Sequence, residues 1–498
     1  MYSAIRYIQR LSVGCLILAG ISCQKLVEVD PPRNTITSVQ VFKTEAQTEG
    51  ALAGIYSRMI NGDVAGSVDE NARNSFAAGL VTVLGGLSAD EMRASNDAST
   101  TGWIPFESNT LTFETSRAAD NIWKTAYTAI YGANAVIEGI AGSKSDQFSA
   151  QAKHALSGEA KMIRAFSYFY LVNLFGDVPL ALTIDFNQTI HIPRTPEAKV
   201  YEQIIADLKD AIQQMPENYD YGLQERVRPN KWAAMALLAR VYLFNGDYEQ
   251  AAIAASTVIS QQNLYGIELD LSKAFLRNSR EAIWQLKQTN EQNELRNATP
   301  EGYLFQPVPA FTGAIPFRLT PSLQDAFEPG DKRWAFWVDS TDHSFSINLP
   351  PGIFYYPAKY KVGRSNGAPG ASSPEYYMML RLAEMYLVRA EAVVRGPAQD
   401  ISEAVRNLNT LRFRAGIPDL PLTLTKEEVL AAIEKERQTE LFAEWGHRWL
   451  DLKRTGRAQI VLPALPYKQP WMGNYQLKYP IPESEIRFNS ALVQNDEY

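Results

Sequence analysis

Apolar residues recur at helical spacing in five stretches of the chain, which cover residues 44–58, 118–140, 156–174, 230–260 and 375–417. In the second stretch, positions 123, 127, 130 and 134 follow one another at intervals of four, three and four residues, so they share one helix face. The third stretch is followed by a glycine at 176 and a proline at 179, which predict its end. The pattern predicts a mostly α-helical protein.

The last two stretches follow one plan, in which a helix, a short turn and a second helix succeed each other. The turns are Asn-Gly-Asp at 245–247 and Gly-Pro at 396–397, and ARVYL at 239–243 aligns with AEMYL at 383–387. Small alanines let paired helices pack closely, and a tyrosine or leucine fills the space to the next pair. The plan resembles tetratricopeptide repeats and predicts a helical repeat scaffold.

Two segments lack this period. Residues 262–374 are rich in proline, glycine, asparagine and aromatic residues, and EAIWQLKQTN at 281–290 reads as a strand. Residues 61–116 are dominated by Gly, Ser, Asn and Thr and are expected to form loop-rich surface. We therefore expect repeats in residues 41–261 and 375–498, interrupted by a loop-rich insert with short strands at 262–374.

The N-terminus has the pattern of an export signal. Two arginines and no acidic residue precede a short apolar run that ends at Cys23. This resembles a bacterial lipoprotein signal, in which residues 1–22 are removed, Cys23 is lipidated and residues 23–40 form a tether. The usual leucine three positions before the cysteine is Gly20 here, so a plain secretory signal and a misplaced start remain alternatives. After cleavage one cysteine is left, too few for an internal disulfide.

Charge and motifs narrow the functional classes. The net charge is −7, and removal of residues 1–22 deletes two arginines and no acid, which gives −9 and argues against a nucleic-acid partner. The four histidines form no HExxH or HxH pattern, and there is no GxSxG, phosphate loop or zinc-type cysteine cluster. We expect no catalytic residues, metal or cofactor, although 55 acidic residues leave a glycosidase pair open.

Charged residues also gather in ERQTELFAEWGHRW, near the C-terminal end. Leu441, Trp445 and Trp449 stand four apart and predict an apolar helix stripe. Four polar neighbours of this stripe have the residue types of an acid–base group: Glu440, Glu444, His447 and Arg448. Because buried charges must be paired, we expect these four to form ion pairs that hold the C-terminal helix to the repeats.

Several motifs in order resemble the SusD/RagB family of outer-membrane nutrient-binding lipoproteins of Bacteroidetes. They are LSADE at 87–91, W-x3-Y-x2-I-x3-N at 123–134, LVNLFGDVP at 171–179, RLAEMYLVRAEA at 381–392, LNTLRFRAGI at 408–417, EKERQTELFAEWGHRWLDLKRTG at 434–456 and the C-terminal segment 479–498. The resemblance implies a SusD-like fold and a non-catalytic protein. It also implies a lipid-anchored protein at the cell surface, which captures ligand as a lid on a SusC-like TonB-dependent transporter.

Sugar rings have apolar faces and polar edges, so a glycan site needs exposed aromatic platforms with polar groups at the rim. The two loop-rich segments supply such residues, and the resemblance assigns ligand contacts to the region after LSADE. The candidates are Asp90, Arg93, Asn96 and Trp103 in the first segment, and Tyr303, Phe305, Trp334, Trp337, Tyr355 and Tyr356 in the second.

Three other functions remain open on the sequence. A relative that captures peptides would need backbone donors and acceptors rather than aromatic platforms. An envelope scaffold would need the repeats alone, and the aromatic supply of the insert argues against it. An enzyme is the fourth reading and has no motif in its favour.

Overall fold

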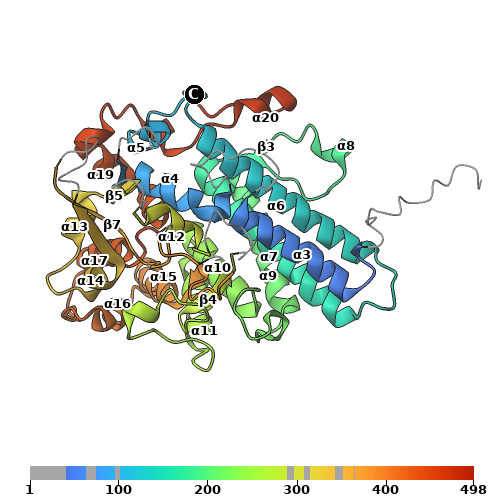
Figure 1. Cartoon of the computed structure of the whole chain (residues 1–498), viewed down its shortest axis with the longest axis horizontal. Coiled ribbons are helices and arrows are strands. Elements are labelled where there is room, and N and C mark those ends of the chain that lie inside the picture. The colour runs from blue at the N-terminus through green and yellow to red at the C-terminus, as the bar shows by residue number, and fades with distance from the viewer. Residues whose placement is uncertain are drawn as a thin grey trace, which may run out of the picture.

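The computed structural model describes residues 41–62, 75–95, 101–288, 297–307, 315–342, 351–363, 365–368 and 370–498. The predicted signal, Cys23, the tether and Asn96 lie outside these ranges. Within them the chain is mostly α-helical, with a few short strands, as predicted (Figure 1).

The scaffold is a row of helices in which each packs on the next along the chain. Helix α6 lies on α7, α7 on α9, α9 on α10, α10 on α11 and α15 on α16, while α3 packs on α6 at one end (Figure 1). The bounds are α3 Glu45–Asn61, α6 Arg117–Gly142, α7 Ala150–Phe175, α9 Glu197–Gln214, α10 Lys231–Phe244, α11 Tyr248–Ile259, α15 Leu382–Arg395, α16 Ile401–Ala415 and α17 Lys426–Glu440.

Local chemistry sets the ends of these helices. The Asn230 side chain accepts hydrogen bonds from two backbone N–H groups at the start of α10, and Asp247 caps α11. Helix α7 ends at Phe175 because Gly176 takes a φ of +81°, a conformation that a residue with a Cβ rarely adopts. Helix α7 therefore ends where the glycine at 176 predicted its end.

The interruption of the array is visible in the packing. Helix α11 ends at Ile259 and α15 begins at Leu382, yet the two pack directly against each other. The chain between them leaves the row of helices and returns to it. The prediction of a helical repeat scaffold with a large, short-stranded insert is confirmed.

Among the described residues, the strands form four antiparallel pairs. Strand β1 (Met92–Ala94) pairs with β5 (Phe317–Leu319), β2 (Val178–Pro179) with β3 (Arg194–Thr195), β4 (Ala282–Leu286) with β8 (Tyr377–Arg381), and β6 (Val338–Asp342) with β7 (Ile353–Pro357). Strand β4 confirms the strand predicted within residues 281–290.

The insert also contains three short helices that we did not predict: α12 Pro300–Phe305, α13 Pro321–Ala326 and α14 Lys332–Trp337. Thr299, Thr320 and Asp331 cap them by accepting hydrogen bonds from the first turn. A threonine followed by proline opens α12 and α13, which is a recognised helix start. Helices this short carry too little period to be found from hydrophobic spacing.

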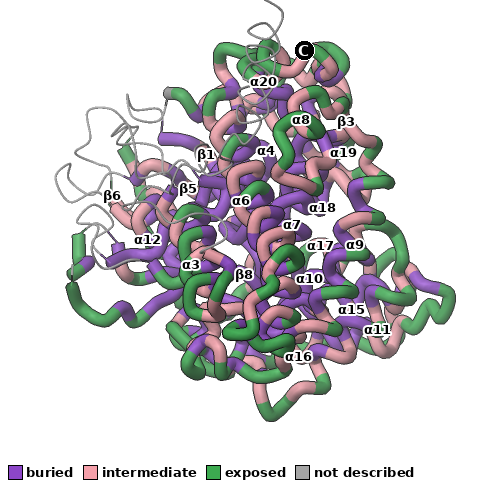
Figure 2. The backbone as a smooth tube through the Cα atoms, turned by 90° about the vertical axis from the view of Figure 1, so that its right-hand side faces the viewer, coloured by how far each residue is buried: buried purple, intermediate pink, exposed green. Residues whose placement is uncertain are grey.

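The prediction of loop-rich surface at residues 61–116 is wrong for its middle part. The π-helical turn Phe76–Leu80 and helix α4 (Val81–Ser88) are buried throughout, which Figure 2 marks in purple. A helix that is apolar on all sides belongs to a core and shows no amphipathic period. Helix α5 (Ile104–Glu107) follows this buried part.

The predicted helix stripe at Leu441, Trp445 and Trp449 is also wrong. Helix α17 ends at Glu440, and α18 (His447–Arg454) begins after a turn in which Trp445 has a φ of +49° and Gly446 of +65°. The three apolar side chains are buried, but from three different backbone conformations. Gly446 lies against Gly85 of α4, where an added Cβ on Gly85 would stand 2.5 Å from the Gly446 Cα.

Two short helices, α19 (Ala458–Val461) and α20 (Glu483–Phe488), complete the C-terminal part, and α8 (Phe186–Thr189) lies in the connection between β2 and β3. None of the described helices combines the length and apolar character needed to cross a bilayer.

Candidate functional site

A buried network of charged groups joins the insert to the helical array. Arg414 of α16 places its Nη1 atom 2.6 Å from Glu281 and its Nη2 atom 2.5 Å from Glu440. Arg381, at the end of β8, lies 2.6 Å from the same Glu440. Burial alone would raise the pKa of Glu440, but Arg414 and the other arginines hold that pKa well below its usual range. The carboxylate is therefore ionised in the core.

The network extends into α14 and the segment after β7. Arg333 lies 2.7 Å from Asp331 and 2.6 Å from Glu436, which ties α14 to α17. Lys359 forms an ion pair with Glu444. Burial lowers the pKa of Lys359 to about 8, although Glu444 opposes that shift. These pairs fix the base of the insert on the scaffold.

The predicted ion pairs near the C-terminal end are confirmed for Glu440, Glu444 and Arg448. Arg448 pairs with Asp90, with Nε–Oδ1 at 2.7 Å. The prediction is wrong for His447, because burial holds the pKa of its imidazole well below the usual range and leaves it neutral. Its Nδ1 atom has no hydrogen-bond partner among the described residues.

Asp90 is a predicted ligand residue that the structure places inside the protein. Its side chain is 1% exposed, accepts two hydrogen bonds from Arg448 and accepts a third, 2.8 Å long, from the Ser322 hydroxyl. Together these bonds lower the pKa of Asp90 against the raising effect of burial. Asp90 therefore fastens the segment after α4 to α18, and its side chain is not open to solvent as a ligand contact would require.

Four predicted aromatic residues lie in the core rather than on the surface: Trp103, Phe305, Trp337 and Tyr356. Trp103 and Phe305 both set their rings edge-on to Phe317, at centroid distances of 5.9 Å and 6.0 Å. Trp337 is 1% exposed and donates its indole N–H to the carbonyl oxygen of residue 271. Short amphipathic helices and strands bury one face of the insert, so aromatic content alone did not separate packing from ligand contact.

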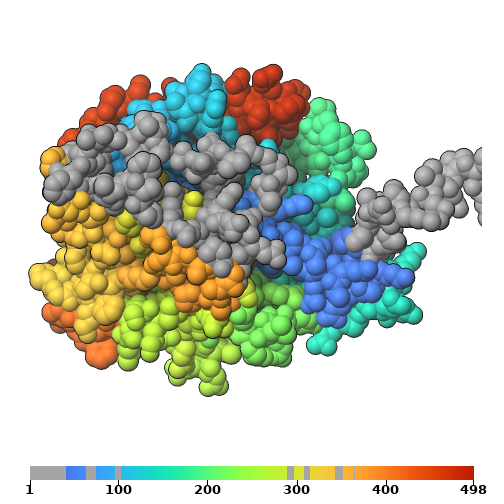
Figure 3. Space-filling model, viewed as in Figure 1, coloured from blue at the N-terminus to red at the C-terminus, as the bar shows by residue number. Residues whose placement is uncertain are grey.

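Two of the aromatic candidates keep solvent exposure and lie together. Trp334 of α14 and Tyr355 of β7 are half-buried, with ring centroids 4.9 Å apart at an interplanar angle of 58°. Phe327 supports Trp334 from the side, at 5.3 Å. Phe336 and Ile353 next to them are 39% and 62% exposed. Helix α14 and strand β7, which carry these residues, belong to the part of the chain that is gold in Figure 3.

The polar candidate Arg93 lies on strand β1. Its side chain is 29% exposed, its Nε atom is 2.7 Å from a Glu107 oxygen, and its guanidinium carbon lies 4.7 Å from the centre of the Tyr467 ring. Tyr303 of α12 is half-buried as well. We refer to Arg93, Tyr303, Trp334 and Tyr355 as the ligand face, because these four predicted residues remain open to solvent.

Strand β7 separates the Trp334–Tyr355 pair from a second group of side chains near Arg93. Side chains alternate along a strand, so Tyr355 points to one side of β7, and Phe354 and Tyr356 point to the other. On the second side, Phe354 lies 4.8 Å from the guanidinium carbon of Arg318, which stands opposite Arg93 in the β1–β5 register. The sequence analysis missed Arg318, because only the strand pairing shows its place.

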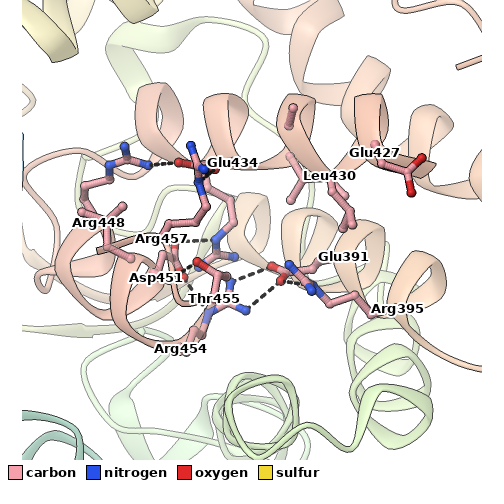
Figure 4. Close-up of a pocket in the computed structure, with 14 residues that line it drawn as sticks. Glu391, Arg395, Glu427, Leu430, Glu434, Arg448, Asp451, Arg454, Thr455 and Arg457 are labelled. Carbon is pink, nitrogen blue, oxygen red and sulfur yellow. Dashed lines mark hydrogen bonds and ion pairs between the residues drawn. The ribbon is translucent and has the colours of Figure 1, made fainter. Parts of the chain in front are cut away.

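A cavity of about 370 Å³ lies elsewhere, between α15, α17 and α18 (Figure 4). Its wall carries Arg454, 2.6 Å from Glu391, and Arg448, 3.1 Å from Glu434. Burial would raise the pKa of Glu391, but Arg454 and its neighbours bring it to about 2. The charged groups largely neutralise one another, and the described residues that line the cavity include no aromatic side chain. It does not have the lining of a sugar site.

A metal site is not indicated by the geometry. Within the described ranges, no three histidine, cysteine, aspartate or glutamate side chains are grouped to hold an ion.

Comparison with known proteins agrees with the architecture. The chain matches the family model described as "Starch-binding associating with outer membrane" over residues 84–243 and the SusD family model over residues 322–498. The SusD-like protein P2 of Formosa agariphila is 28% identical, with 97% of both chains covered. The chain belongs to the SusD/RagB family.

Solved structures share the fold. A SusD superfamily protein from Bacteroides thetaiotaomicron superposes with a TM-score of 0.75 at 22% identity, covering 91% of this chain and 100% of that one. A laminarin-binding SusD-like protein gives a TM-score of 0.72 at 24% identity, covering 92% of this chain and 100% of that one.

Proposed function

We propose that this chain is a cell-surface lipoprotein that binds oligosaccharides at its ligand face and passes them to a SusC-like TonB-dependent outer-membrane transporter. The observation that carries the proposal is the pair of half-exposed rings, Trp334 and Tyr355, presented by the insert rather than by the repeats. Aromatic rings offer large contact area to the apolar face of a sugar, at little cost in side-chain entropy.

The insert is also rigidly supported, which favours a binding role. Arg333 is fully buried and ties α14, which carries Trp334, to α17 of the scaffold. Phe327 packs against both Trp334 and Phe442, so the exposed ring rests on the core. A ring that is held in place before binding loses little freedom when a ligand arrives.

The family and its members supply the ligand class. One matching family model is described as starch-binding and outer-membrane-associated, and a structural neighbour is named for laminarin binding. These names, together with the aromatic pair, favour glycans over peptides as ligand. They also favour binding without chemical conversion.

The location follows from the N-terminal pattern. We propose that Cys23 carries the lipid and that residues 23–40 span the distance to the outer membrane. Lipid chains hold a protein at a bilayer firmly when two or more are attached. The helical array would provide the broad, stiff surface that docking on a transporter requires.

The test is a binding titration of the full chain in mild detergent. Calorimetry and tryptophan fluorescence detect the binding. The probes are laminarin oligosaccharides, malto-oligosaccharides, acidic oligosaccharides and a peptide library. We expect saturable binding to one saccharide class and a loss of about tenfold or more in Trp334→Ala. The matched control is Phe413→Ala, because Phe413 is an aromatic residue 72% exposed on α16 of the array.

The outcomes separate the competing functions. Saturable peptide binding without any saccharide response would make the chain a peptide-capturing protein. No binding to either panel by a folded sample would favour an envelope scaffold. Equal losses in Trp334→Ala and Phe413→Ala would place the site away from the ligand face.

A further inference from the structure

Two arginines stand side by side on the β1–β5 ribbon. Arg93 is the direct register partner of Arg318, and their neighbours Met92, Ala94, Phe317 and Leu319 point into the core from both strands. Opposite residues in an antiparallel pair have Cβ atoms roughly 5 Å apart on the same face. Like charges in this position repel each other, so the arrangement costs stability unless an anion lies nearby.

Within the described ranges, Glu107 is the one carboxylate that forms an ion pair with either arginine. Glu107 places one oxygen 2.7 Å from Arg93 and accepts the backbone N–H of Ala94 with the other at 2.8 Å, so both of its oxygens are engaged. Among the described residues, Arg318 has no acidic partner, and its buried Nε–H has no acceptor. Burial, followed by the charge of Arg93, lowers the pKa of Arg318.

A further unused donor and a further cation lie beside the two arginines. The buried hydroxyl of Tyr467, whose ring lies under Arg93, has no hydrogen-bond partner in the described part of the chain. Lys468 beside it is also buried and donates to the carbonyl oxygens of residues 87 and 88. The nearby Asp90 is fully engaged by Arg448. The cluster therefore has more cationic and donor groups than anionic ones.

Each of the two guanidinium groups also lies over an aromatic ring. Arg93 lies over Tyr467 at 4.7 Å and Arg318 over Phe354 at 4.8 Å. A guanidinium stacked on an aromatic ring keeps its N–H edge free for planar recognition of an oxyanion. An ordered fork of this kind matches a carboxylate or a sulfate group.

We propose that Arg93 and Arg318 form a subsite for an oxyanion, so that the ligand face selects acidic glycans, whose sugars carry carboxylate or sulfate ester groups. This inference rests on the proposed function, because it names the saccharide class that the ligand face takes. The bound oxyanion accepts hydrogen bonds from Arg318 and relieves the repulsion between the two guanidinium groups.

The test compares saccharides that differ only in charge. Oligogalacturonate is measured against its fully methyl-esterified form, and a sulfated carrageenan oligosaccharide against its desulfated form, by calorimetry on the full chain in detergent. We expect the charged member of at least one pair to bind about tenfold tighter or more, with a preference that weakens as salt rises. The saccharide pair that shows the preference identifies the bound group as a carboxylate or a sulfate ester.

Variants connect the preference to the ribbon. Arg318→Gln is expected to remove most of the preference for the charged saccharide and leave affinity for the neutral partner unchanged, while Arg318→Lys retains part of it. The matched control is Arg406→Gln, which removes an equal charge from an exposed position on α16. Thermal unfolding checks that Arg318→Gln is folded.

The outcomes test the oxyanion subsite and the glycan function separately. Equal affinity for charged and neutral saccharides would overturn the oxyanion subsite and leave glycan binding intact. Binding of a polyglutamate peptide that is lost in Arg318→Gln, with no saccharide response, would support the oxyanion subsite and overturn the glycan function. A preference that Arg406→Gln reduces as much as Arg318→Gln would show a general charge effect and would overturn the subsite.

Discussion

The helical array and the insert are built on different principles. In the array, each helix packs against a chain neighbour, as α6 does on α7 and α10 on α11. In the insert, strand β5 finds its partner β1 more than 200 positions earlier, and Arg333 reaches across to Glu436 of α17. The comparison teaches that the scaffold is encoded locally, whereas the ligand face is assembled from distant segments and secured by buried charges.

The largest expected effect comes from cutting the charge network between the two regions. Arg414→Met removes the guanidinium that pairs with both Glu281 and Glu440. Glu281 then keeps the longer ion pair with Arg381, at 3.4 Å, and a hydrogen bond from the backbone N–H of residue 268. Loss of one partner from a buried ion pair costs about 3–5 kcal/mol of unfolding free energy. Urea denaturation measures this loss of unfolding free energy.

The exposed arginine Arg406 on the same helix is the control. Arg406→Met should change the unfolding free energy by less than about 0.5 kcal/mol, because its pair with Glu403 is solvent-exposed. Equal losses in the two variants would mean that the buried network does not hold the insert.

A second comparison lies within the insert, between two tryptophans of helix α14. Trp337→Ala should lower the unfolding free energy by about 3–5 kcal/mol, because it empties a fully buried site. Trp334→Ala removes a half-buried ring and should cost clearly less, while it lowers saccharide affinity. Denaturation and saccharide binding are measured on both variants. A larger loss of stability in Trp334→Ala than in Trp337→Ala would contradict the assignment of Trp337 to the core and Trp334 to the ligand face.

A third comparison uses two glycines. Gly85→Ala would bring a Cβ within 2.5 Å of the Gly446 backbone, so the contact between α4 and α18 must open, at a cost of about 1–3 kcal/mol. Gly50 in α3 has nothing within 4 Å of its added Cβ, so Gly50→Ala should stabilise the array by about 0.5–1 kcal/mol. Thermal unfolding measures both effects. A melting temperature that shifts in the same direction in both variants would contradict the close approach of Gly85 to Gly446.

The last prediction concerns the pH dependence of stability. Burial raises the pKa of Glu301 on α12 from 4.5 to about 8, against a hydrogen bond from Thr82. Between these pH values the folded state keeps a proton that the unfolded chain has released, so the unfolding free energy falls as pH rises, by about 1 kcal/mol per pH unit. Glu301→Gln should flatten this slope.

The pH experiment compares denaturation at pH 5.5 and 7.5 in the native chain, in Glu301→Gln and in a control, Glu427→Gln, at an exposed site on α17. We expect the control to keep the native slope. An unchanged slope in Glu301→Gln would show that Glu301 is ionised in the folded protein.

The array could be predicted from the sequence because its signals are local. Helical period placed α6, α10 and α15, and Gly176 marked the end of α7. The helices of the insert could not be predicted, because six residues form less than two helical turns and show no clear hydrophobic period. Helix α4 escaped because a segment that is apolar on every side has no period at all.

The ligand face could be predicted only in part. Trp334 and Tyr355 keep part of the exposure expected of them, whereas Trp337, three residues after Trp334, fills the core. Burial of an aromatic residue in a short helix depends on what packs above it, which no local pattern records. Asp90 was chosen for its place after LSADE, and its partner Arg448 lies more than 350 positions away.

Hydrogen–deuterium exchange on the full chain, with and without a saturating oligosaccharide, tests most directly the claim that the ligand face and not the array takes the ligand. We predict slower exchange at residues 92–95, 303–307, 317–319 and 353–357, and unchanged exchange in α16 and α17. Protection confined to α15, α17 and α18, around the charged cavity of Figure 4, would contradict the account.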